Sequence, residues 1–226
     1  MKLVFVSPTY GPVDSAAIRY QRAAIMHATN HGVTWVGDMS PERMKFDAAR
    51  NNAVRSVLTN CPEAEAIFWC DSDVILPVDA ISRLANSGLD FITGIYFQRY
   101  PPHWPLISYF NQYGGYDGKG AFAWYTDWPA NTIAPIDGCG FGCVLTSTKM
   151  LMSMDAPWFT FERFSEDFDF CLRAKKSGFQ LHVDTGILCG HLADPQPIGI
   201  EEFNAQRPFL LKEREARDTQ AHPSEV

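Results

Sequence analysis

The sequence predicts an α/β fold in which helices cover the faces of an open, mostly parallel sheet. Two observations lead to this prediction. Short apolar runs alternate along the chain with longer segments in which apolar residues recur at helical spacing, as in a series of strand–helix units. Of the 226 residues, 46% are apolar and 20% are charged, an ordinary balance for one domain with a buried core.

The first half of the chain supplies most of these units. Its first strand is the apolar run Lys2–Val6. Asp14 or Ser15 can cap the following helix, and Gly32 ends it. The run 66–70 is continuously apolar, as central parallel strands are. The expected elements are strands at 2–6, 33–36, 66–70 and 91–97 and helices at 14–30, 41–58 and 77–86.

The second half begins with a stretch, 99–135, that shows no clean period and is rich in aromatic residues, Pro and Gly. A non-periodic stretch of this length is usually functional unless short strands hide in it. The regular pattern then returns, with strands expected at 144–145 and 181–183 and helices at 148–153 and 165–177. From Lys212 the tail is charged and is either a surface helix or disordered.

Composition excludes some classes of function. The formal net charge is −7 at pH 7, so a broad nucleic-acid-coating surface is not expected. No stretch reaches the roughly 18 apolar residues that a membrane span needs. The six cysteines form no CxxC pair and no signal peptide is visible, so we expect reduced, buried thiols and a cytoplasmic protein.

The strongest chemical signal is Asp71-Ser72-Asp73, directly after the buried strand 66–70. Open α/β sheets bind ligands at the carboxyl ends of their strands. On an extended chain, residues two apart point to the same side, and two converging carboxylates suit Mg²⁺ or Mn²⁺. Taken alone the triplet is equally good turn chemistry.

Two later segments carry further candidates. In Ser165-Glu166-Asp167-Phe168-Asp169 the serine and the acids are ordinary stabilisers of a helix start, but a carboxylate there can also act as a general base. His191 follows the last apolar run, and an imidazole as third ligand would favour Mn²⁺ over Mg²⁺.

Two further features have equally open readings. The alternating glycines of 138–142 either permit close packing or form a backbone wall against a sugar, with Gly140 at the centre. Aromatic residues of the non-periodic stretch either form a small second core or stack on sugar rings or bases, and the candidates are Trp104, Tyr109 and Trp124.

These segments, in this order, resemble the glycosyltransferases of GT-A fold, and in particular the inverting family 2 group and its phage and bacterial relatives. The resemblance covers about residues 2–192. It rests on the ordered set P-T-Y, F-D-A-A-R-N-N-A, D-S-D, D-G-C-G-F-G, S-E-D-F-D-F-C-L-R-A-K-K-S-G and C-G-H. It implies a Rossmann-like open mixed sheet flanked by helices. Residues 1–203 would form one catalytic domain, with a nucleotide-sugar and metal half at 1–97, an acceptor and catalytic-base half at 98–203, and a tail or helix at 204–226.

The resemblance also implies roles for single residues. Asp71, Asp73 and His191 would hold Mn²⁺ or Mg²⁺ against the diphosphate of a nucleotide-sugar, first of all a UDP-sugar. Asp167 would be the catalytic base of an inverting transfer, and Glu166 would contact the sugar or the acceptor. The residues expected at the donor are Pro8, Thr9, Tyr10, Asp47, Arg50, Ser72 and Gly140.

Two other classes of protein stay open. A nucleotidyltransferase also uses paired carboxylates and a metal, but it normally has a basic, Gly-rich loop after the first strand, whereas 7–12 contains one Gly and no Lys or Arg. A non-catalytic carbohydrate- or nucleotide-binding module would use the aromatic stretch alone. The acceptor can be a glycan, a protein, a metabolite or a modified DNA base, and the sequence does not indicate an oligomeric state.

Overall fold

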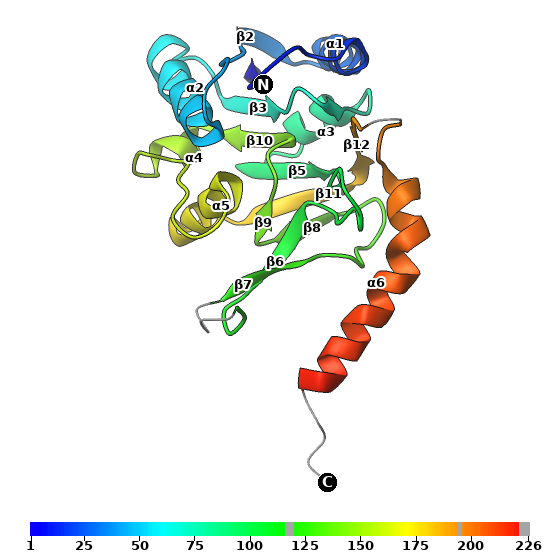
Figure 1. Ribbon diagram of the computed structural model, residues 1–226. Coiled ribbons are helices and arrows are strands. Elements are labelled where there is room, and N and C mark those ends of the chain that lie inside the picture. Colours follow the sequence, from blue (N-terminus) through cyan, green and yellow to red (C-terminus); the bar gives the residue numbers. More distant parts are fainter. Residues whose placement is uncertain (116–119, 194–195, 222–226) are drawn as a thin grey trace.

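The computed structural model describes residues 1–115, 120–193 and 196–221 (Figure 1). The strands are β1 (Lys2–Val6), β2 (Thr34–Met39), β3 (Ala66–Cys70), β4 (Val74–Ile75), β5 (Phe91–Ile95), β6 (Ile107–Asn111), β7 (Ala121–Trp124), β8 (Ile133–Ile136), β9 (Gly138–Cys139), β10 (Cys143–Ser147), β11 (Leu181–Leu188) and β12 (Gly190–His191). The helices are α1 (Ser15–Asn30), α2 (Phe46–Asn60), α3 (Ala80–Ala85), α4 (Thr148–Met152), α5 (Glu166–Lys176) and α6 (Ile200–Ala221).

A central sheet organises the molecule, with strand order β2-β1-β3-β10-β5-β11-β8. The pairs β1–β2, β1–β3 and β5–β11 are parallel. Strand β10 lies antiparallel between β3 and β5, and β8 is antiparallel to β11. The sheet is therefore mixed, which confirms the open mixed sheet that the resemblance implies, whereas the apolar runs alone had predicted a mostly parallel one. An apolar run shows the same alternation in either direction, so periodicity cannot reveal strand direction.

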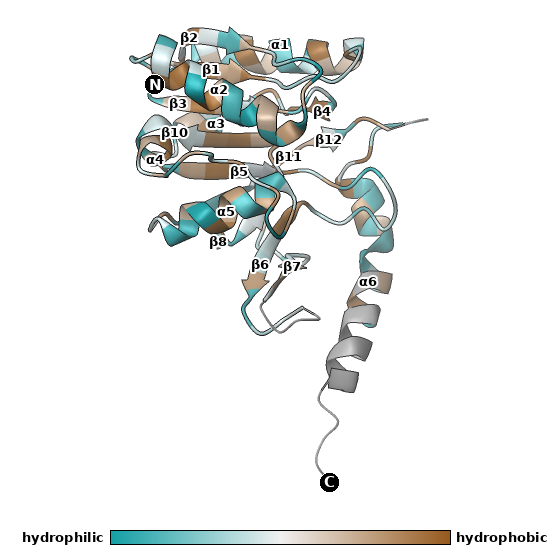
Figure 2. Ribbon diagram, turned by 60° about the vertical axis from the view of Figure 1, so that its left-hand side comes forward, coloured by the Kyte–Doolittle hydropathy of each residue, from teal (hydrophilic) through white to brown (hydrophobic). Residues whose placement is uncertain are grey.

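Each face of this sheet is packed against its own helices. In β1 and β3, Val4 and Trp69 belong to the core beneath α2, α4 and α5, whereas Leu3 and Phe68 belong to the core beneath α1 and α3. Successive side chains of a strand point to opposite faces, so one continuously apolar strand serves both cores. Figure 2 shows these strands as brown ribbons between helices that are teal on their outer sides.

Helix α2 begins at Phe46 and not at Pro41, which corrects the predicted boundary. Arg43 has a φ of 53°, which a right-handed helix does not accept. Residues before the helix instead pair with the first loop: Thr9 N–H donates to Pro41 O at 3.0 Å, and Arg43 N–H donates to Thr9 O at 3.0 Å. At α1 the predicted cap is confirmed, because Asp14 Oδ1 accepts the Ala16 N–H at 2.6 Å.

Short strands do hide in the aromatic stretch. Strands β6 and β7 pair with each other, and β6 also pairs with β9, forming a small sheet of order β7-β6-β9 below the central one. Strand β8 from the same stretch joins the central sheet. Strands β6, β7 and β8 have only four or five residues each, too few for a period to stand out from the turns around them.

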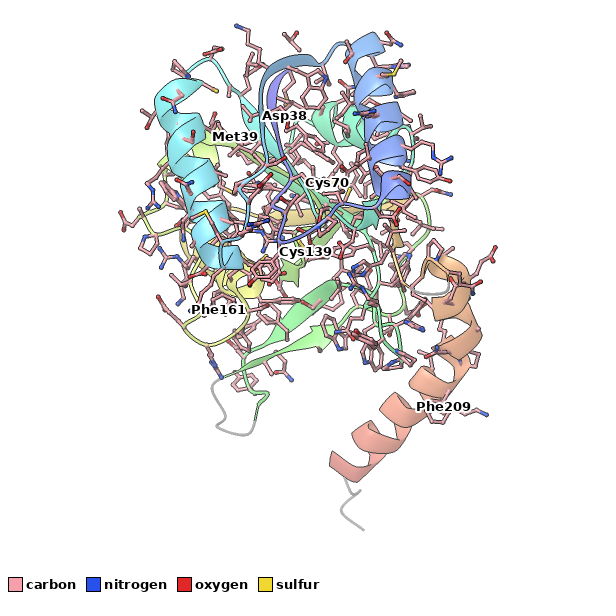
Figure 3. All side chains as sticks on the ribbon, turned by 45° about the horizontal axis from the view of Figure 1, so that its top comes forward. Asp38, Met39, Cys70, Cys139, Phe161 and Phe209 are labelled. Carbon is pink, nitrogen blue, oxygen red and sulfur yellow. The ribbon has the colours of Figure 1, made fainter. Side chains whose placement is uncertain are left out.

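Helix α6 starts on the body and leads away from it (Figure 1). Phe203, fully buried, stacks between Phe97 and Trp128, with ring centroids 5.4 Å from each. Further along, the exposed Phe209 lies on the projecting part of the helix (Figure 3). The charged tail from Lys212 thus continues a helix to Ala221, and 222–226 lie outside the described residues.

The six cysteines are all free and buried, as predicted. Among the described residues, no helix is both long enough and apolar enough to cross a membrane.

Candidate functional site

Asp71 follows the last residue of β3, Cys70, which Figure 3 labels near the middle of the molecule. The chain turns here, because Val74 N–H donates to Asp71 O at 3.1 Å. The D-S-D segment therefore forms a turn and is not the extended chain that was expected. Ser72 lies within the turn, half-buried, between the two carboxylates. In consequence Asp71 and Asp73 have different charged partners.

Asp71 is paired with Arg50 of α2. The guanidinium donates to Asp71 Oδ1 at 3.0 Å with one nitrogen and contacts Glu166 Oε1 with another. Only 3% of the Arg50 side chain is exposed, and its charge also lies over the Phe141 ring, 5.4 Å from the centroid. Arg50 thus connects the end of β3 to the start of α5 inside the protein.

Asp73 is paired on the open side of the turn. Its Oδ2 contacts the Arg99 guanidinium and lies 3.4 Å from His191 Nε2. His191 Nδ1 lies 2.7 Å from Phe97 O and must donate to it, since a carbonyl only accepts. This hydrogen bond turns Nε2 of the imidazole toward Asp73. The structure therefore brings the predicted third ligand to the second aspartate.

The start of α5 contains three acids with different surroundings. Asp169 is buried and accepts backbone N–H groups of Glu162, Arg163 and Phe164, so it shapes the loop before the helix. Asp167 is partly exposed, and its Oδ1 accepts the Ser165 hydroxyl at 2.5 Å. A capping serine usually accepts a free backbone N–H group of its helix. Ser165 does not, because its hydroxyl donates to the Asp167 side chain instead.

Burial sets the protonation of these carboxylates. It raises the pKa of Glu166 to about 7, with Arg50 opposing and Asp167 adding to the shift. Burial likewise raises the pKa of Asp71 against the opposing charge of Arg50. At Asp73 the effect of burial is outweighed by the hydrogen bond and charge of His191 and by Arg99, so its pKa falls below the usual value.

A cleft of about 350 Å³ brings most of these groups together. Arg50, Asp71, Glu166 and Asp167 line it together with Trp124 of the small sheet. The remaining lining residues are Phe46, Gln98, Leu106, Ser165 and Phe168. One residue predicted for the metal, Asp71, thus lines the same cleft as the two acids of α5 and Trp124, whereas Asp73 and His191 are not among its lining residues.

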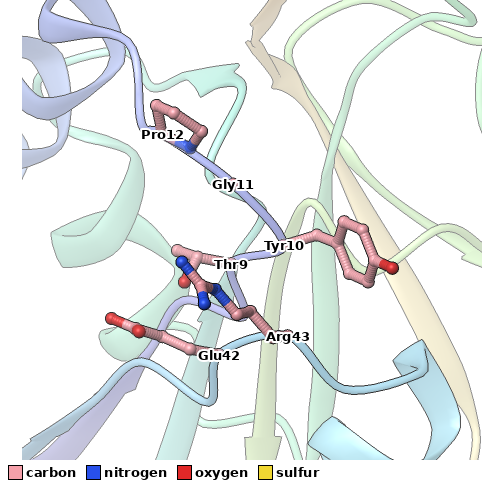
Figure 4. A pocket seen from close by; sticks show the side chains of 6 residues that line it. All are labelled: Thr9, Tyr10, Gly11, Pro12, Glu42 and Arg43. Atoms are coloured by element: carbon pink, nitrogen blue, oxygen red, sulfur yellow. The ribbon is translucent and has the colours of Figure 1, made fainter.

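A second hollow of about 470 Å³ lies at the first loop (Figure 4). Thr9 and Tyr10, two of the residues predicted for the donor, line it, and Tyr10 is 73% exposed. Pro8 is buried behind them. Glu42 and Arg43 complete the lining, although the sequence had not indicated them for this role. An isolated β-bridge between Thr9 and Glu42 holds the first loop beside the segment before α2. Arg43 therefore places a positive charge at this loop, which has no Lys or Arg of its own.

The predicted aromatic residues do not share one surface. Trp104 stacks on Trp124 with ring centroids 6.5 Å apart, and Trp124 meets Phe168 edge-on at the cleft. Tyr109 stands opposite Ala123 in the β6–β7 ladder and packs on Tyr125. Neighbours of Trp124 along a strand face the other way, so Tyr109 lies on the opposite face of this ladder from the cleft.

Two further predicted donor residues lie apart from both hollows. Gly140 is buried, and a Cβ there would come within 2.1 Å of the Tyr96 hydroxyl, so close packing explains this glycine. Asp47 lies in the first turn of α2, and its buried Oδ1 has no hydrogen-bond partner among the described residues.

The side chains around Asp73 have the types of atoms that bind a divalent cation. Carboxylate oxygens and an imidazole nitrogen together are ligands that Mn²⁺ accepts, and Asp73 and His191 already face each other. Asp71 is turned toward Arg50. Within the described ranges, no three His, Cys, Asp or Glu side chains form a group that holds a metal. Asp73 and His191 thus lie close together, and a metal ion bound there would need further ligands.

Comparison with known proteins shows the fold. No protein-family model matches the chain, and no curated protein matches its sequence. Among solved structures, A197 from STIV superposes with a TM-score of 0.59 at 17% identity, over 89% of this chain and 92% of that one.

Two further similar structures are described as sugar-transfer proteins. GalNAc-T7, solved with UDP, GalNAc and Mn²⁺, has a TM-score of 0.55 at 10% identity over 85% of this chain. The catalytic domain of Drosophila β1,4-galactosyltransferase 7, solved with xylobiose, has a TM-score of 0.50 at 13% identity over 82%. The chain spans 44% and 66% of the lengths of these two proteins. A mixed seven-stranded sheet flanked by helices, as in GT-A-like proteins, is therefore the fold of this chain.

Proposed function

We propose that the chain is a glycosyltransferase that moves a sugar from a nucleotide-sugar donor to a hydroxyl acceptor with the help of a divalent cation. The observation that carries the proposal is the shared cleft, in which Asp71, the acids Glu166 and Asp167, and Trp124 face one cavity. A metal-side carboxylate, a candidate base and an aromatic platform are the three parts that such a transfer needs.

Each part has a place in the reaction. Thr9, Tyr10 and Arg43 would hold the nucleotide end of the donor at the first loop. Asp73 and His191, with Asp71, would hold Mn²⁺ or Mg²⁺, which supplies a Lewis acid for the leaving diphosphate. Trp124 would present its face to a sugar ring of the acceptor.

The catalytic base in this proposal is Asp167. Its Oδ1 is held by the Ser165 hydroxyl, and the carboxylate borders the cleft, where an acceptor hydroxyl can reach it. Glu166 is buried against Arg50 and is better placed to orient its neighbours than to accept a proton. Asp167 would remove the acceptor proton as the oxygen attacks the anomeric carbon and the bond to the diphosphate breaks. Attack from the side opposite the diphosphate would invert the configuration.

The experiment measures thermal shifts with UDP-, GDP-, CMP- and dTDP-sugars, with UTP as a triphosphate probe, in Mn²⁺ or EDTA. A true donor stabilises the fold by mass action. We expect one nucleotide-sugar class, first of all UDP, to raise Tm in Mn²⁺ but not in EDTA, and not in Asp73→Ala. A shift indifferent to EDTA and to Asp73 would reject metal dependence, and a shift confined to UTP would favour a nucleotidyltransferase.

A turnover measurement separates an enzyme from a binding module. Donor hydrolysis or transfer is followed for the wild type, Asp167→Asn and the control Asp127→Asn, whose exposed carboxylate pairs with Arg207 away from the cleft. We expect Asp167→Asn to keep the donor-induced shift and lose turnover by about 10²–10⁴-fold. Equal turnover in Asp167→Asn and the control would remove Asp167 from the role of base.

A further inference from the structure

Arg99 has no role in the reaction described so far, although it lies beside Asp73 and His191, the two proposed metal ligands. Its guanidinium contacts Asp73 Oδ2 and lies 3.4 Å from His191 Nε2. The arginine therefore occupies the position between these two groups in which a cation is expected. A guanidinium and a divalent cation repel each other, so they cannot share this oxygen and this nitrogen at close range.

Hydrogen bonds fix the backbone on both sides of Arg99, whereas its side chain is partly exposed to solvent. Gln98 N–H donates to Trp104 O at 2.9 Å, and His103 N–H donates to Tyr100 O at 3.0 Å, closing a short hairpin after β5. By contrast, 40% of the Arg99 side chain and 35% of the Asp73 side chain are exposed. An exposed ion pair is weakly held, so the long arginine side chain can leave Asp73 at little cost.

Gln98, the neighbour of Arg99, lines the cleft, so the released side chain starts beside the place where the donor and the acceptor would meet in the proposed reaction. A planar guanidinium fork matches two oxygens of a phosphate group. A nucleoside diphosphate bound beside the metal would therefore offer Arg99 a new negatively charged partner in place of Asp73.

We propose that Arg99 is an exchangeable counter-ion. It neutralises Asp73 while the metal site is empty, and it turns to the diphosphate of the donor once a divalent cation has taken Asp73 and His191. The inference rests on the proposed function and adds to it a donor-binding residue whose partner changes with the state of the site.

The first test measures binding of Mn²⁺ alone, by titration calorimetry or by the EPR signal of free Mn²⁺. The variants are Arg99→Gln, Arg99→Lys and, as matched control, Arg207→Gln, which removes a similarly exposed arginine paired with Asp127. Losing a like charge a few ångströms from the metal should tighten Mn²⁺ binding about ten-fold in Arg99→Gln. Arg99→Lys and Arg207→Gln should stay near the wild-type affinity.

The second test measures binding of UDP and GDP at saturating Mn²⁺. Arg99→Gln should bind the diphosphate about ten-fold more weakly than the wild type, and Arg99→Lys should recover part of the loss. The opposite signs of the two effects are the signature of exchange, because a merely misfolded site would weaken both. Unliganded Tm values confirm that the variants are folded.

Several outcomes would overturn the inference. Mn²⁺ binding that is unchanged or weaker in Arg99→Gln would show that the arginine does not compete with the metal. Diphosphate binding that is unchanged in Arg99→Gln would show that it gains no new partner. If the wild type binds Mn²⁺ and UDP and only these differences are missing, the proposed function stands alone. If neither the wild type nor Arg99→Gln binds Mn²⁺, the metal-dependent function fails together with the inference.

Discussion

Two arginines each pair with one carboxylate of the turn after β3, and their surroundings differ sharply. Arg50 is 3% exposed, contacts both Asp71 and Glu166, and lies against aromatic rings. Arg99 is 40% exposed and contacts Asp73 from the tip of a hairpin. Each pair joins a guanidinium to a carboxylate, and the two differ in burial and in their further partners, Glu166 for Arg50 and His191 for Asp73.

The difference shows what burial does to an ion pair. A buried guanidinium cannot leave its partners without exposing uncompensated charge to a medium of low polarity, so Arg50 is a fixed part of the site. An exposed pair exchanges partners readily because water solvates either charge. One turn therefore carries a carboxylate with a permanent counter-ion beside a carboxylate whose counter-ion is replaceable.

The largest effect is expected from Arg50→Met. This change leaves Asp71 and Glu166 buried without their cation and should lower the free energy of unfolding by about 3–5 kcal/mol. Urea denaturation at pH 7 measures the loss, and Arg50→Lys should recover part of it. A loss below about 1 kcal/mol would mean that Arg50 is no more essential to the fold than an exposed arginine.

A pH-dependent effect is expected at Glu166. Its pKa is about 7 in the folded protein and about 4.3 in the unfolded chain. Between these values the unfolded state binds fewer protons, so this group makes the protein less stable as pH rises from about 4.5 to 7. Wild type should lose about 2–3 kcal/mol relative to Glu166→Gln over this range. Parallel stability curves of the two proteins in urea would contradict the assignment.

A smaller effect is expected from Asp71→Asn and Asp73→Asn, and the first change should lower stability more than the second. The first change leaves the buried Arg50 with one anionic partner fewer and should cost about 1–3 kcal/mol of stability. The second removes an exposed carboxylate and should cost less than about 1 kcal/mol. Mn²⁺ binding should weaken in both variants, whereas the unliganded Tm should fall clearly only in Asp71→Asn. Equal Tm values would remove the distinction between the two pairs.

The smallest effect on stability is expected from Arg99→Gln. Its pair with Asp73 is exposed, so the free energy of unfolding should change by about 0–1 kcal/mol without ligand. The measurement is urea denaturation in EDTA beside Arg50→Met. A loss comparable to that of Arg50→Met would make Arg99 a structural residue and deny it the freedom to exchange.

Sequence patterns were sufficient for most of the long strands and helices and for several residues of the cleft. Apolar runs located β1, β3 and β5, and the motifs singled out Asp71, Glu166 and Asp167, which the structure brings to one cleft. These inferences succeed because strand ends and helix starts are local properties of the chain.

What sequence reasoning missed depends on contacts between distant segments. Arg43 reaches the first loop only because β2 lies beside β1, and Arg99 reaches Asp73 only because its hairpin follows β5. Tyr109 and Trp124 differ in the face that they present, which the register of β6 and β7 decides. Arg50 was expected at the nucleotide, and its burial between two acids follows from the packing of α2. The sequence shows which residues are positively charged, but it does not show which carboxylate or ligand each of them pairs with.

The place of β10 in the sheet bears on how the protein is made. Strands β3 and β5 come from the first hundred residues, but the strand between them is Cys143–Ser147. A nascent chain that has left the ribosome only as far as β5 therefore holds two apolar strands with open edges and no strand to join them. Because unpaired strand edges promote aggregation, this early part of the chain needs protection until β10 emerges. For the same reason, dividing the gene after β5 would produce two aggregation-prone fragments and not two separate domains.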